Sequence, residues 1–103
     1  AGMLAPGGEV EIPGSHAQFC IRGRELYPKY VEELVERSGL PIDLRLCGAV
    51  ELAADEDDLA RLEARASAQA KLGISSIALS RDELSSLTPG VDPDDWAGAF
   101  HYP

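Results

Sequence analysis

Few side chains in this sequence have the type and spacing that catalysis requires. The two imidazoles, His16 and His101, do not lie in the H-E-x-x-H spacing of a zinc site. The two thiols, Cys20 and Cys47, are too few and too far apart for a zinc motif, so we expect free and buried cysteines. A nucleophile elbow, a phosphate-binding loop and a G-x-G-x-x-G motif are absent from the sequence. We therefore predict no catalytic and no metal-binding residue in this sequence.

The opening stretch, residues 1–14, could instead approach a ligand through its backbone. It reads AGMLAPGGEVEIPG and contains four glycines and two prolines. Glycine allows backbone conformations and close approaches that a Cβ atom would prevent, so we expect a loop here. Glu9 and Glu11 follow the paired glycines, either as part of a solvated acidic loop or as part of a site.

A long amphipathic helix is predicted over residues 15–38. Apolar residues recur there at steps of three and four, and Gly39 follows as a typical C-terminal cap. Pro28 lies in the middle of this segment. Because proline lacks an N–H group and its ring crowds the preceding turn, we expect a kink or an interruption at Pro28.

A strand with one buried face is predicted over residues 42–52. Apolar and polar residues alternate along this segment with the period of two that a strand requires. Gly48 interrupts the apolar face with a residue that has no side chain to pack. We expect a bulge at Gly48, or a close approach of another backbone or a ligand.

The second half of the sequence predicts two helices and two short strands. A helix capped by Asp55 should cover residues 55–72, and a short strand should follow around residues 77–79. An S-x-x-E capping box opens a short helix over residues 80–88, and a last strand is expected over residues 97–102. This order of elements predicts an α+β or α/β fold.

Composition narrows the possible partners. The sequence has 103 residues, with 9 basic and 18 acidic side chains and a net charge of -9. Phosphate binding needs clustered Lys and Arg, so we expect no nucleic-acid partner. No apolar run approaches the roughly 20 residues that a membrane-spanning helix needs, and we find no secretory signal pattern. We therefore expect a soluble, cytoplasmic protein that does not bind membranes.

Taken together, several motifs resemble one known family. They occur along nearly the whole sequence in the order AGMLAP, LYPKYVEELVERSGLPID, CGAVELA, DEDDLARLEA, LSRDELSSLTPGV and GAFHYP. In this order and spacing the sequence resembles the flavin-dependent glycine oxidases of thiamine biosynthesis, within the D-amino-acid oxidase superfamily. The first motif and LSRDELSSLTPGV are the most specific.

The resemblance implies an α+β fragment of a two-domain flavoprotein oxidase, with FAD as the cofactor. Residues 1–14 would be a loop beside FAD that leaves the dinucleotide-binding domain. Residues 15–103 would form part of the substrate-binding domain, with a mixed or antiparallel sheet and flanking helices. Glu9 matches an acidic position near the active-site entrance. Four residues would lie against the flavin ring and offer it backbone N–H groups: Ala1, Gly2, Met3 and Leu4.

The resemblance also implies an activity. Such oxidases convert glycine or a related small amino acid or amine to an imine by hydride transfer to the flavin, and O2 is reduced to H2O2. The cofactor supplies this chemistry, which agrees with the few catalytic side chains in the sequence. The partners would be the remaining segments of the same oxidase, including its FAD domain, in a homo-oligomer when intact. The fragment alone is expected to be inactive.

A different class of function is the alternative. The chain could be a stand-alone acidic interaction or dimerisation module without catalytic activity, kept in solution by its charge. Co-expression with the missing FAD segments would distinguish the two hypotheses. An oxidase fragment should give a yellow, peroxide-producing complex, whereas an interaction module should stay colourless and separate.

Overall fold

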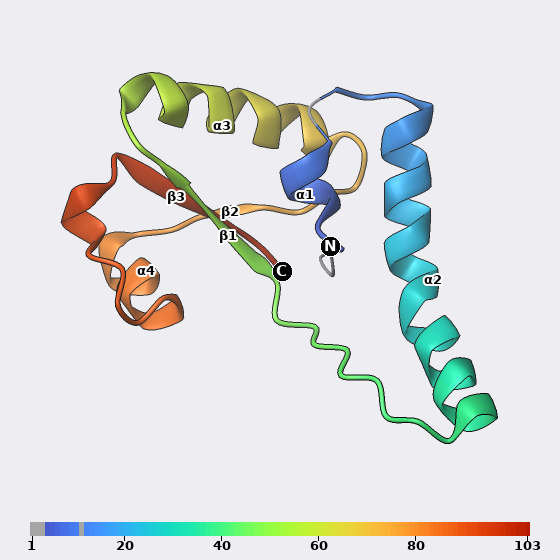
Figure 1. Ribbon diagram of the computed structural model, residues 1–103. Coiled ribbons are helices and arrows are strands. Elements are labelled where there is room, and N and C mark those ends of the chain that lie inside the picture. Colours follow the sequence, from blue (N-terminus) through green and yellow to red (C-terminus); the bar gives the residue numbers. More distant parts are fainter. Residues whose placement is uncertain (1–3, 11) are drawn as a thin grey trace.

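The computed structural model describes residues 4–10 and 12–103 (Figure 1). Helices and strands alternate along most of these ranges, with one 3-10 turn, η1, before the last strand. The helices are α1 (Pro6–Glu9), α2 (Ser15–Ser38), α3 (Glu56–Ala70) and α4 (Arg81–Leu87), the strands are β1 (Ala49–Ala53), β2 (Ile77–Ala78) and β3 (Gly98–Tyr102), and η1 covers Pro93–Asp95.

The three strands form one antiparallel sheet in the order β1-β3-β2. The central strand, β3, pairs with β1 along its whole length, with Ala49 opposite Tyr102. It pairs with β2 over two residues, with Ile77 opposite His101. The sheet and its helices confirm the predicted α+β class and the antiparallel arrangement.

The core lies between α3 and the sheet. The side chain of Asp55 accepts a hydrogen bond from the backbone N–H of Asp58 at 2.9 Å, which caps α3 as predicted. The helix then packs against β1 and β3. Its apolar stripe meets the sheet in one buried cluster, formed by Ala53, Leu62, Ala66, Ile74, Phe100 and Tyr102.

Helix α2 lies next to α1 and extends well past the sheet (Figure 1). The helix ends at Ser38, and Gly39 caps it as predicted. The φ of Gly39 is +68°, a left-handed conformation that suits glycine. Of the kink or interruption predicted at Pro28, the interruption does not occur: the helix continues through this residue. Most of its surface is exposed, and the buried residues within it are Ala17 and Val31.

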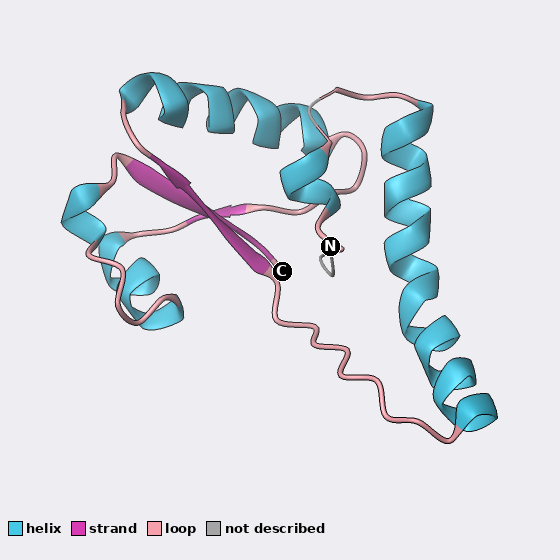
Figure 2. Cartoon of the chain, in the orientation of Figure 1, coloured by secondary structure: helices cyan, strands magenta, loops and turns pink. Residues whose placement is uncertain are grey.

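The strand predicted over residues 42–52 is wrong in its first half. Residues 40–48 form a long connection without strand pairing, drawn as a loop in Figure 2, and pairing begins at Ala49. Strand β3 ends opposite Ala49, so residues before it have no neighbouring strand to pair with. The close approach predicted at Gly48 is confirmed: a Cβ atom there would lie 2.6 Å from the carbonyl oxygen of Tyr102.

The loop predicted over residues 1–14 also needs correction, because residues 6–9 form α1. Pro6 occupies the first position of this helix, where its fixed φ favours a helical start and its missing N–H has no cost.

Both cysteines are free, as expected, but Cys20 is only half-buried and Cys47 is exposed. Within the described ranges, no helix is both long and apolar enough to cross a membrane.

Candidate functional site

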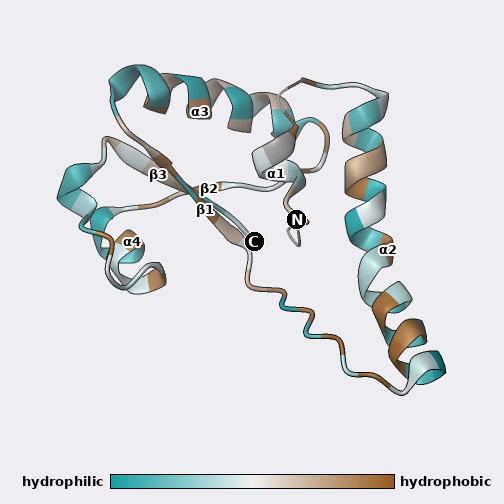
Figure 3. Ribbon diagram, viewed as in Figure 1, coloured by the Kyte–Doolittle hydropathy of each residue, from teal (hydrophilic) through white to brown (hydrophobic). Residues whose placement is uncertain are grey.

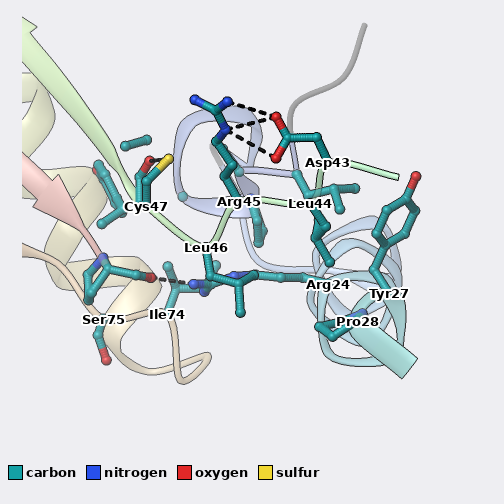
Figure 4. A pocket seen from close by; sticks show the side chains of 18 residues that line it. Arg24, Tyr27, Pro28, Asp43, Leu44, Arg45, Leu46, Cys47, Ile74 and Ser75 are labelled. Atoms are coloured by element: carbon teal, nitrogen blue, oxygen red, sulfur yellow. Dashed lines mark hydrogen bonds and ion pairs between the residues drawn. The ribbon is translucent and has the colours of Figure 1, made fainter. Parts of the chain in front are cut away.

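A cavity of about 430 Å³ lies between α1, the middle of α2 and the connection before β1 (Figure 4). We call it the N-terminal cavity. Five parts of the chain that are far apart in the sequence line it: residues 4–7, then Arg24, Tyr27 and Pro28 of α2, residues 43–49, residues 74–75 and residues 102–103.

Arg24 crosses this cavity. Its side chain leaves α2 and reaches the opposite wall, where the guanidinium donates a hydrogen bond to the carbonyl oxygen of Pro103 (Figure 4). On another wall, Arg45 and Asp43 form an exposed ion pair at 2.8 Å. Exposed pairs of this kind add little stability. The charged groups at the cavity thus interact with the protein itself and leave an interior lined largely by apolar residues.

Among the predicted site residues that the structure describes, Leu4 is the one that it places at this cavity. Leu4 lines the cavity with a side chain that is 43% exposed. Ala1, Gly2 and Met3 lie outside the described residues, and so does the side chain of Glu9. The backbone of Glu9 forms the last residue of α1.

The described part of the opening segment leaves room for another group beside it. Leu4 offers an exposed apolar side chain. A Cβ atom built on Gly8 would meet no atom within 4 Å, so the backbone at this turn of α1 is uncovered. Both features allow another group to lie close to the main chain.

The histidines and cysteines do not gather at the cavity. His16 and Cys20 lie one turn apart on α2, with their side-chain atoms 3.6 Å from each other, on an exposed surface. Cys47 lines the cavity, but His101 lies on β3 with its backbone paired to both neighbouring strands. Within the described ranges, no group of three or more His, Cys, Asp or Glu side chains could hold a metal ion.

Two buried polar residues of α3 were not singled out by the sequence patterns. Gln69, which is 1% exposed, donates hydrogen bonds from its side-chain amide to the carbonyl oxygens of Gly7 and Val10. Arg65 donates to the carboxylate of Glu51 and, at 3.4 Å, to the hydroxyl of Tyr102. The sequence did contain a signal for the burial of these two residues. Arg65 follows Leu62 by three residues and Gln69 follows Arg65 by four, and this spacing places all three on the buried face of α3.

Arg65 keeps its charge in this buried position. Burial opposes the charged form, but the hydroxyl of Tyr102 and the carboxylate of Glu51 together raise the pKa of the Arg65 guanidinium above its usual value. The side chain of Arg65 is 7% exposed and that of Glu51 is 30% exposed. This ion pair therefore links α3 to β1 and, through Tyr102, to β3.

Comparisons with known proteins agree on one family. A family model described as FAD dependent oxidoreductase matches residues 1–103. The glycine oxidase from Geobacillus kaustophilus, known from a crystal structure, superposes with a TM-score of 0.90 and is 28% identical in sequence. No curated protein sequence matches the chain.

The structural match covers 100% of this chain and 28% of the Geobacillus enzyme. The chain thus spans less than a third of the length of that glycine oxidase and has the same fold as the matching part. FAD, the cofactor expected from the sequence, is the one that the family description names.

Proposed function

This chain belongs to the family of FAD-dependent oxidoreductases, and from that premise we propose that it forms part of a glycine oxidase. The full protein would oxidise glycine or a related small amino acid or amine to an imine and reduce O2 to H2O2. The observation that carries this proposal is the match of the whole chain to the Geobacillus glycine oxidase, with a TM-score of 0.90.

The chain would contribute in two ways. Residues 1–14 would leave the FAD domain and place Ala1, Gly2, Met3 and Leu4 against the flavin ring. Residues 15–103 would form part of the substrate-binding domain, with Glu9 near the active-site entrance between the two parts. FAD supplies the acceptor for the hydride that leaves the substrate.

The role of these residues is to shape the site and exclude water, and none of them is proposed to transfer a proton. Leu4 would cover the cofactor with an apolar side chain, and the backbone at Gly8 would stay open to neighbouring groups. The remaining segments of the same oxidase would bind the rest of FAD and the substrate carboxylate. We propose a homo-oligomer for the intact protein.

The test is to purify the full-length protein and record its visible absorption spectrum and peroxide production. We expect a yellow protein that forms H2O2 with glycine, and the rates with sarcosine and D-alanine would define the substrate preference. A colourless protein that forms no peroxide with any of these amines would contradict the proposal and favour the interaction module.

A matched pair of variants tests the place of the flavin. Leu4→Asp puts a charge at the proposed flavin surface and should weaken FAD binding by about tenfold or more, since an apolar contact is replaced by a charge. Leu87→Asp changes a similarly exposed leucine of α4, which lies on the far side of the sheet, and should leave FAD affinity unchanged. Equal FAD affinities of the two variants would argue against Leu4 as a flavin contact.

A further inference from the structure

We propose that Gln69 is a positioning residue that holds α1 in place and thereby sets the position of Leu4, one of the residues proposed to face the flavin. The inference rests on the proposed function for the identity of that ligand. The two hydrogen bonds that Gln69 donates next to and within α1 do not depend on that function, so their effect on α1 can be measured independently of FAD binding.

The contacts of Gln69 are directed at the backbone of α1. Its side-chain nitrogen lies 2.8 Å from the carbonyl oxygen of Gly7 and 2.6 Å from that of Val10. An amide nitrogen has two hydrogens, so each carbonyl oxygen can accept one of them. Gln69 is 1% exposed and Val10 is 2% exposed, so water does not compete for these bonds.

A helix as short as α1 needs such external support. It has four residues, and its last carbonyl oxygens have no partners within the helix. Helices of this length are not stable by themselves in water. Gln69 supplies donors for the C-terminal end of α1 from another helix, α3, whose own position is set by the core.

A second residue, Tyr102, also packs against α1. The ring of Tyr102 occupies the space where a Cβ atom of Gly7 would lie. The hydroxyl of Tyr102 accepts a hydrogen bond from Arg65, one turn before Gln69 on α3. Helix α1 is therefore enclosed between α3 and the end of β3 (Figure 1).

The position of α1 determines where the preceding residues lie. Leu4 and Ala5 connect directly to Pro6, and the carbonyl oxygen of Ala5 accepts a hydrogen bond from the N–H of Gly8 at 2.9 Å. Leu4 and Ala5 therefore have little freedom to move once α1 is held. Groups that contact a cofactor work best when neighbouring residues lock their positions in this way.

The test compares Gln69→Met with two controls in the full-length protein. Methionine has a similar size but cannot donate a hydrogen bond. The substitution removes no bond to the side-chain oxygen of Gln69, because that oxygen has no hydrogen-bond partner within the described ranges. Gln18→Met makes the same change on the exposed surface of α2. Leu62→Val loosens the core of α3 and should lower the melting temperature without touching α1.

Three measurements are made on each variant: the melting temperature, the hydrogen exchange of residues 4–10 and the dissociation constant of FAD. For Gln69→Met we expect about tenfold faster exchange in residues 4–10 and about tenfold weaker FAD binding, the effect of losing two hydrogen bonds. Gln18→Met should match the unchanged protein. Leu62→Val should lower only the melting temperature.

The inference is overturned if Gln69→Met lowers the melting temperature as Leu62→Val does and leaves both exchange and FAD affinity unchanged. Where Gln69→Met yields no folded protein, Gln69→Asn takes its place, because its shorter amide cannot reach both carbonyl oxygens. If the unchanged protein binds no FAD, the proposed function fails, and the exchange of residues 4–10 still decides whether Gln69 holds α1.

Discussion

Gly7 and Gly8 are neighbours in α1 but have different surroundings. Gly7 is buried against the ring of Tyr102, and a Cβ atom added to it would lie 2.6 Å from Cε1 of that ring. Gly8 is exposed and would place a Cβ atom in open space. Packing within this chain requires the first glycine, whereas no described residue of the chain packs against the second.

This difference predicts opposite effects of the same substitution. Gly7→Ala should destabilise the protein by about 1–3 kcal/mol, because the new methyl group overpacks a buried contact. Gly8→Ala should be neutral or stabilise by up to about 1 kcal/mol, because alanine favours the helix. Urea unfolding of the two variants in the full-length protein measures both effects. A stable Gly7→Ala variant would mean that Tyr102 does not pack on α1 as described.

At the scale of single elements, α4 shows how local sequence directs folding. The hydroxyl of Ser80 accepts a hydrogen bond from the N–H of Glu83, and the carboxylate of Glu83 accepts one from the N–H of Ser80 at 2.8 Å. This is the reciprocal capping box that the sequence predicted. The bonds from the backbone and the hydroxyl of Ser80 lower the pKa of the Glu83 carboxyl group below its usual value.

The lowered pKa makes the start of α4 sensitive to acid. The cap contributes fully above the ordinary carboxyl pKa of 4.5, and its contribution is lost as the pH falls through the lower pKa of the folded state. Glu83→Gln keeps an acceptor for the cap but cannot titrate, so its melting temperature should fall less than that of the unchanged protein between about pH 6 and pH 3.

Asp82→Asn is the matched control for this experiment. It removes a carboxylate from the same turn of α4 without changing the contacts between Ser80 and Glu83. It should therefore retain the acid sensitivity that Glu83→Gln loses. Identical melting curves of the unchanged protein and Glu83→Gln at every pH would contradict the proposed contribution of the cap.

At the scale of the whole molecule, the chain is extended and rich in exposed apolar groups. Its radius of gyration is 15.7 Å, whereas a compact domain of this length has about 13 Å. Its accessible surface of 7306 Å² exceeds the roughly 5,600 Å² of a folded monomer of this size. Apolar residues along α2 and the connection before β1 contribute to this surface, as the brown segments in Figure 3 show.

Such a surface predicts that the isolated 103-residue chain associates with itself. Phe19 and Leu46 are 77% and 80% exposed, so replacing both with serine should reduce association without disturbing the core. Light scattering and the binding of a hydrophobic dye measure this effect. A monomeric chain that binds no dye would instead indicate a self-contained module.

Local patterns were sufficient for most of the elements. The cap at Asp55, the capping box at Ser80 and the left-handed Gly39 depend on residues within one or two turns, so α2, α3 and α4 could be predicted closely. Gly48 pointed to a close backbone contact that the structure confirms. The approach of a ligand to residues 1–14 stays a prediction.

Only the tertiary structure decided which of these segments pair and what holds them. Alternation over residues 42–52 satisfied the pattern of a strand, but a strand also needs a neighbour, and β3 ends opposite Ala49. The burial of Gln69 could be predicted from its spacing on α3, but its partners could not, for the same reason. Its partners are backbone carbonyl groups about 60 residues away, and any sequence has such groups at every position. Long-range contacts of this kind leave no local signal.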